Sequence, residues 1–212
     1  MRKLLSLVLL VAIFTGCDAK ESRVSTDNLI ALSWQKGFCK LNKHKRECKS
    51  IKKDSFEANN FVLHGLWPQP KSKKYCKGKK KSRVENELYK KLKIVMPGTR
   101  SGLHKHEWKK HGTCYGGGVD RYYKDSIKLL KAVNQTKLRE FFVKNQGKIV
   151  KKEQLNRLFD YPRKFNMICK KGVITELRFA LKGDIGSSNL STLLKAAKPL
   201  HGGCKRGKIV GY

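Results

Sequence analysis

The chain has 212 residues, of which 49 are lysine or arginine and 16 are acidic, so its formal net charge is +33. This length excludes two full-size domains, and after the first few residues no apolar stretch is long enough to cross a membrane. The charge favours a polyanionic partner, with nucleic acid first and an anionic membrane or cell-wall polymer second, although a lysine-rich solvated surface would look similar.

The first segment has the features of an export signal. A basic start, Met1-Arg2-Lys3, is followed by an apolar stretch over 4–14, which is too short for a permanent transmembrane helix. The next letters, FTGC (14–17), resemble a bacterial lipobox with Phe where Leu is usual, so we expect a lipid on Cys17; cleavage after Ala19 is the alternative. The expected divisions are a signal peptide over 1–16, a polar tether over 17–27 and one domain over 28–212, exported to the periplasm or cell envelope.

Cysteine usage agrees with export. Without Cys17, six of the seven cysteines remain, and an even number in an exported chain indicates disulfides. Six cysteines allow 15 pairings, and spacing alone leaves them open. The lack of any C-x-x-C pair argues against a zinc site.

Apolar periodicity then predicts the elements in chain order. A strand is expected over 29–38, a basic loop over 40–53, the end of a buried strand within 56–67, and a second basic run over 71–83. Helices are expected over 84–96, 119–133, 136–143 and 152–159, paired strands over 162–170 and 173–181, and a loop-rich tail after them. This order indicates a single α+β domain with a central antiparallel sheet flanked by helices.

Two short segments, FVLHGLWP (61–68) and HEWKKHGTC (106–114), carry the most distinctive chemistry. His64 ends an apolar run and has Trp67 beside it. If 106–111 is helical, at about 100° per residue His106, Glu107, Lys110 and His111 lie within about 140° of one another. Imidazoles beside a carboxylate and an ammonium suit proton transfer next to negative charge, and a tryptophan can stack on a base. This pattern indicates phosphodiester chemistry on a nucleotide, although a histidine at a strand end is often structural.

The same segments resemble a known family. FVLHGLWPQ (61–69) and HEWKKHGTC (106–114) are similar, in order, to the two catalytic segments of the ribonuclease T2 family, and LIALSWQKGFC (29–39) is similar to its first strand. The resemblance implies a disulfide-stapled, monomeric endoribonuclease that cleaves single-stranded RNA through a 2′,3′-cyclic phosphate, with no metal or organic cofactor. The implied roles are general base for His111, general acid for His64, transition-state stabilisation for Glu107 and Lys110, phosphate binding for His106, and base binding for Trp67 with Gln69.

The resemblance also implies the disulfides Cys76–Cys114 and Cys169–Cys204, which leaves Cys39–Cys48. Many eukaryotic members have Asp at the position of Gln69. Because an amide both donates and accepts hydrogen bonds, we expect low base selectivity. Trp108 is expected to pack in the core.

Two alternatives remain. A zinc hydrolase would place histidines four residues apart on a helix, whereas His106 and His111 are five apart. A non-catalytic cationic protein that binds RNA or envelope polymers on the same scaffold would explain the charge without the histidines. His104 is expected on the surface, and His44 and His201 receive no role.

Overall fold

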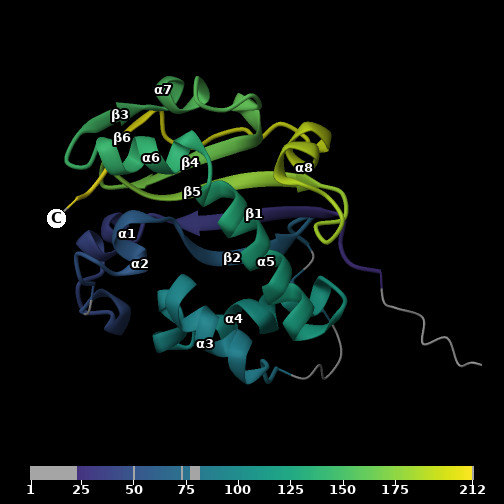
Figure 1. The fold of residues 1–212 in the computed structure, drawn as a ribbon. Helices are drawn as coiled ribbons and strands as arrows, with labels where there is room; N and C mark the ends of the chain where they lie inside the picture. Colours follow the sequence, from purple (N-terminus) through teal and green to yellow (C-terminus); the bar gives the residue numbers. More distant parts are fainter. Residues whose placement is uncertain (1–22, 50, 73, 77–81, 212) are drawn as a thin grey trace, which may run out of the picture.

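The computed structural model describes residues 23–49, 51–72, 74–76 and 82–211. The expected signal peptide, Cys17 and the start of the tether lie outside the described residues. Within them, six strands form one sheet in the order β2-β1-β5-β6-β3, with β4 paired to β5 (Figure 1). All pairings are antiparallel except β5 with β6. The strands are β1 Asp27–Ser33, β2 Val62–Pro68, β3 Ile149–Lys151, β4 Phe165–Lys170, β5 Val173–Lys182 and β6 Arg206–Lys208.

Helices surround the sheet. In Figure 1, α3 and α4 lie beyond β2, α5 connects this group to the sheet, and α6 and α7 lie near β3 and β6. The helices are α1 Gln35–Leu41, α2 Phe56–Asn59, α3 Asn86–Val95, α4 Leu103–Lys110, α5 Gly118–Asn134, α6 Lys137–Lys144, α7 Lys152–Asn156 and α8 Leu190–Ala196. None of those described has the length and apolar character needed to span a bilayer.

The two faces of the sheet differ in chemistry. Ile30 and Leu32 of β1 lie opposite Phe179 and Leu177 of β5, and all four are fully buried. Because side chains alternate along a strand, the intervening β1 positions face the other side, where they pair with Arg178 and Glu176 of β5. One face therefore builds the core, and the other presents charged groups next to β2.

A β-bulge lies where β2 carries its histidine. Ala31 of β1 pairs with Gly65, and the next residue, Leu32, pairs with Leu63, so His64 is the extra residue between them. A bulge turns one side chain away from regular alternation, and bulges are common beside active sites. Here the bulge lets His64 join the charged face while Leu63 stays buried in the core.

Several sequence-based elements match the structure and others do not. The helices expected over 84–96, 119–133 and 136–143 match α3, α5 and α6 to within two residues. The strand expected over 29–38 was wrong after Ser33, because α1 begins at Gln35, with the Phe38 amide bonded to the Trp34 carbonyl.

The remaining differences lie in the second half of the chain. The helix expected over 152–159 ends at Asn156, and the strand expected over 162–170 begins only at Phe165, because Pro162–Lys164 forms a 3₁₀ turn. The tail also contains α8 and β6, which the pattern did not predict.

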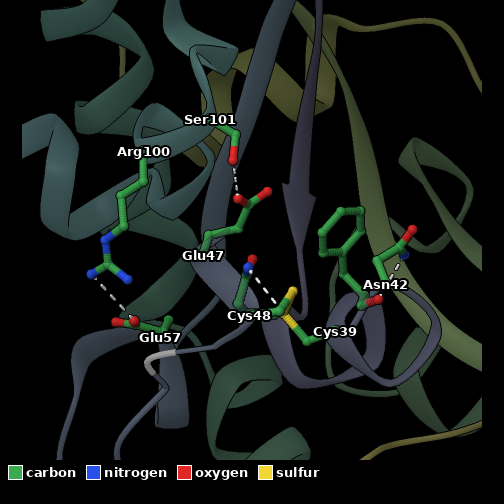
Figure 2. The surroundings of a disulfide bond; sticks show 9 residues. Cys39, Asn42, Glu47, Cys48, Glu57, Arg100 and Ser101 are labelled. Atoms are coloured by element: carbon green, nitrogen blue, oxygen red, sulfur yellow. Dashed lines mark hydrogen bonds and ion pairs between the residues drawn. A yellow bond between two sulfur atoms is a disulfide. The ribbon is translucent and has the colours of Figure 1, made fainter. Parts of the chain in front are cut away.

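Three disulfides are formed, in the pairing that the resemblance implies: Cys39–Cys48, Cys76–Cys114 and Cys169–Cys204. The first ties α1 to the short turn after it (Figure 2). Two buried glutamates lie beside it: Glu47 accepts a hydrogen bond from Ser101, and Glu57 forms an ion pair with Arg100 at 3.8 Å. The second joins Cys76, in the basic run over 71–83, to Cys114, in the turn that follows α4, and therefore constrains the surroundings of His111.

Candidate active site

The two motif segments meet where α4 packs against β2. The indole Nε1 of Trp67 donates a hydrogen bond of 2.7 Å to Glu107 Oε2, and Glu107 Oε1 lies 3.7 Å from His64 Nε2. Gly65 permits this approach, because a Cβ there would lie 2.0 Å from Glu107 Oε2. The glycine between the histidine and the tryptophan is therefore required by the close contact of the two elements.

His111 joins the same cluster from just beyond the end of α4. Helix α4 ends at Lys110, and His111 is its C-cap with φ −125° and ψ −48°. The condition that 106–111 is helical therefore holds only to Lys110, although the His111 amide still donates to the Glu107 carbonyl at 2.9 Å. A short 3₁₀ turn begins at Gly112, whose missing Cβ leaves room for the Trp108 ring, 2.2 Å from where that Cβ would lie.

Both imidazoles contact one indole. The ring centroids of His64 and Trp67 are 5.3 Å apart with an interplanar angle of 84°. Those of His111 and Trp67 are 5.4 Å apart with an angle of 33°. Two histidines from separate elements thus share one tryptophan.

Two cavities adjoin this cluster. One, of about 340 Å³, is lined by His64, His106 and Glu176 together with Phe38, Glu47 and Leu103, among others. The other, of about 190 Å³, is lined by Trp67, Pro68, Gln69, Lys71, Lys74, Lys110 and His111. Every expected catalytic or binding residue except Glu107 lines one of these cavities, and Glu107 is buried between β2 and α4.

Two residues that the sequence reasoning missed complete the cluster. Glu176 Oε2 accepts a short hydrogen bond from His64 Nδ1, and its other oxygen accepts from Arg178 Nε at 2.5 Å. The Arg178 guanidinium lies 5.0 Å from the centroid of the Trp67 ring. The sequence feature that could have pointed to them is the Glu-x-Arg pair within the strand predicted over 173–181, because side chains two residues apart on a strand share one face.

The two histidines are shifted in opposite directions. Burial lowers the pKa of His64, but the hydrogen bond and charge of Glu176, with the charge of Glu107, outweigh burial and raise it above 6.5. Burial and the positive charges of Lys110, His106, His64 and Lys74 lower the pKa of His111 to about 4. At neutral pH this favours a protonated His64 and a neutral His111, which separates a proton donor from a proton acceptor.

The two carboxylates also differ. Burial raises the pKa of Glu107 despite the opposing effects of His64, Trp67, His106 and Lys110. For Glu176, the effects of His64 and Arg178 outweigh burial and lower the pKa. Glu176 is therefore a fixed negative charge, whereas the proton on Glu107 is more easily retained.

The remaining histidines and Trp108 lie elsewhere. Trp108 is buried in the core, as expected. His104 was expected on the surface but is buried, because its ring packs 5.3 Å from Tyr89. His44 and His201 are exposed. The described part of the chain contains no group of three histidine, cysteine or carboxylate side chains placed to hold a metal ion.

Comparison with known proteins agrees with this geometry. The model of the ribonuclease T2 family matches residues 27–184, which is most of the chain. The chain belongs to the ribonuclease T2 family. It is an enzyme that cleaves RNA.

The T2 family relatives include ribonuclease I of Escherichia coli strain K12, which is 24% identical over 86% of this chain and 84% of its own. Trichomaglin, a solved S-like ribonuclease, superposes with a TM-score of 0.57 at 15% identity, covering 88% of this chain and 98% of its own. A mutant of ribonuclease MC1, solved in complex with 5′-UMP, superposes with a TM-score of 0.53 at 16% identity, covering 79% and 92%. At these identities the solved structures show a common fold.

Proposed function

We propose that this protein cleaves single-stranded RNA internally, by metal-independent acid–base transphosphorylation through a 2′,3′-cyclic phosphate. RNA carries a nucleophile, the 2′-hydroxyl, next to each phosphodiester. A base that removes the 2′ proton and an acid that protonates the departing 5′ oxygen are therefore sufficient for the first step. The observation that carries the proposal is the packing of two imidazoles, His64 and His111, on one Trp67 ring.

The surroundings of the two imidazoles support the role proposed for each. His111, neutral at the working pH, takes the 2′ proton. His64, charged by its carboxylate neighbours, donates to the leaving oxygen, and the two exchange roles when water opens the cyclic phosphate. Lys110 and Glu107 stabilise the charged phosphorane, and His106, exposed at the mouth of the larger cavity, binds phosphate.

Base binding is proposed at the smaller cavity. Trp67 and Gln69 line it beside Lys71 and Lys74, whose ammonium groups suit the RNA backbone. The Gln69 side chain donates to the Trp67 carbonyl at 3.1 Å, which leaves its amide oxygen for a base. Because an amide oxygen can accept from several bases, we expect weak selectivity. The larger cavity, on the His64 side, has room for the second nucleoside.

The test is cleavage of bulk RNA by purified protein, with analysis of the product ends. Replacing His64 or His111 by Ala should lower the rate by at least about 10²–10⁴-fold, with circular dichroism unchanged. His201→Ala, an exposed histidine outside the site, is the matched control and should retain full activity.

The substrate and the metal requirement are tested separately. DNA should not be cleaved, and a chelator should leave the rate of RNA cleavage unchanged. Full activity of either active-site variant would refute the role given to that residue, and binding without cleavage would support a cationic binding protein instead.

We also propose that the protein is exported and acts as a monomer. Three disulfides suit an oxidising compartment, and the proposed catalytic groups all come from one chain. A lipid on Cys17 would attach it to a membrane. Mass spectrometry of the mature N-terminus tests the acylation, and light scattering tests the monomer.

A further inference from the structure

Five side chains of the site form a closed ring of contacts. Glu176 bonds to His64 and to Arg178. Arg178 lies over Trp67, Trp67 donates to Glu107, and Glu107 returns to His64. The ring joins β2, β5 and α4. The mechanism given above uses Glu176 only as a charge near His64 and gives Arg178 no role.

The geometry of Glu176 determines how His64 is oriented. Its carboxylate is bonded to Nδ1, so Nε2 is the ring nitrogen left to face Glu107 and the substrate. A neutral imidazole carries its proton on one nitrogen only. A carboxylate at Nδ1 therefore keeps that proton there and leaves the Nε2 lone pair for proton exchange, as in other histidines held by a second carboxylate.

We propose that Glu176 is a positioning residue for His64, which fixes Nε2 toward the scissile phosphate and holds the ring as the imidazolium that donates the leaving-group proton. This inference rests on the proposed acid–base function. In the first step the Nε2 proton passes to the 5′ oxygen as the P–O5′ bond breaks, and His64 becomes neutral, with its remaining proton on Nδ1 and hydrogen-bonded to Glu176. In the second step Nε2 takes a proton from the attacking water.

The charges around His64 decide whether Glu176 can do this. Burial of His64 opposes its charged form, and Arg178, on the same strand as Glu176, opposes it as well. From α4, Glu107 favours the charged form, and His106 lines the same cavity. Lys45 and Glu47 from the loop before α2 line the cavity with opposite charges. Glu176 is the group in direct hydrogen-bond contact, and its own low pKa keeps it charged.

The first test is the pH profile of Glu176→Gln. Glutamine can still accept from Nδ1 but carries no charge, so the pKa of His64 should fall and the basic limb of kcat/KM should move to lower pH. We expect a loss of about 10- to 100-fold at neutral pH, smaller than the loss on removing the imidazole, and recovery to within a few-fold at acidic pH. An unshifted basic limb, or a loss equal at all pH values, would overturn the proposal and leave Glu176 a structural residue.

The second test measures the His64 ring directly, by NMR titration. Glu176→Gln should lower its pKa, and Arg178→Gln should raise it, because Arg178 is a positive charge that opposes protonation. Glu57→Gln is the matched control. Glu57 is also a buried glutamate paired with an arginine, Arg100 at 3.8 Å, but it lies outside the site (Figure 2). It should leave the pKa of His64 unchanged.

The two tests also separate this inference from the proposed function. The NMR titration needs no turnover, so a shift in the pKa of His64 without any ribonuclease activity would leave the Glu176 contact intact and refute the reaction. Normal activity with an unmoved pKa in both β5 variants would refute the role of Glu176 and leave the reaction standing.

Discussion

At the scale of single residues, the site separates two chemically identical side chains by their neighbours. His64 faces two carboxylates, from β5 and from α4, and its pKa is raised. The groups that shift His111 besides burial are all cationic, and its pKa is lowered to about 4. Because each pKa unit corresponds to about 1.4 kcal/mol between protonation states, these surroundings favour opposite protonation states for two imidazoles that contact one indole, which supports the opposite roles proposed for them.

These shifts predict a broad pH profile for kcat/KM. The proposed base, His111, must be neutral, so activity should be lost as the pH falls through about 4. The proposed acid, His64, must be charged, so activity should be lost as the pH rises through a value above 6.5. Initial rates on a dinucleotide, measured across the acidic and neutral range, should show a plateau between these limits. A narrow bell with both limbs near 6.5 would mean that the two sites are not differentiated.

At the scale of elements, the site depends on how closely α4 approaches β2. Glu107 sits above Gly65 and accepts from Trp67, so strand and helix are held at a separation that no side chain at position 65 allows. The bulge at His64 then brings the imidazole to the same carboxylate. One glycine and one extra strand residue therefore set the relative positions of three functional groups.

The corresponding prediction concerns Gly65→Ala. The new methyl group would meet the Glu107 carboxylate at 2.0 Å and the Trp67 indole nitrogen at 2.8 Å, so α4 or both side chains must move. We expect activity to fall by more than about tenfold, with a stability loss of about 1–3 kcal/mol from overpacking, measured by kinetics and urea denaturation.

Gly186→Ala is the matched control for that variant. Its added Cβ would meet the end of the flexible Arg121 side chain, away from the site, and activity should be retained. Equal activity of the two variants would show that the contact between β2 and α4 does not control catalysis.

The elements also explain how much of the site could be predicted from the sequence. His64, Trp67 and Glu107 lie in two short segments whose residue types already indicate the chemistry. Glu176 and Arg178 lie on β5, and only the pairing of β5 with β1, and of β1 with β2, brings them to His64. That long-range register cannot be read from a local pattern.

Local patterns failed at other points for physical reasons. Helix α4 ends at Lys110, with His111 as its C-cap and a 3₁₀ turn from Gly112, so the assumption of a helix over 106–111 holds only to Lys110. His104 reads as polar in the sequence, yet Tyr89 and Tyr123 bury it. Helices with strong apolar periodicity, such as α5, were predicted well because the pattern that buries them is local.

At the scale of the whole molecule, some of the lysines lie beside the candidate site and others lie far from it in the sheet order. Tyr75 and Cys76 are held next to the end of α4 by the Cys76–Cys114 disulfide and by the bond of 2.8 Å from the Tyr75 amide to the Lys110 carbonyl. These constraints place Lys71 and Lys74 on the wall of the cavity that holds His111. By contrast, β6 and β3 lie at the opposite end of the sheet order from β2 (Figure 1). Their lysines are exposed.

This difference predicts which lysines bind the RNA backbone. Lys71→Gln/Lys74→Gln and Lys148→Gln/Lys208→Gln each remove two positive charges, the first pair beside the cavity and the second at β3 and β6. If the site cations contact phosphates, the first variant should raise KM for a long RNA and reduce its dependence on salt, by about 0.7 in the log–log slope for each lost contact. The second should change both only slightly, because neither Lys148 nor Lys208 lines either cavity of the site and salt screens charges that are not in direct contact with the RNA. Steady-state rates at salt concentrations from about 50 to about 300 mM, on a long RNA and on a dinucleotide, measure the difference, with the dinucleotide affected least. Equal effects of the two variants would mean that the overall field attracts RNA and that the lysines beside His111 do not guide it.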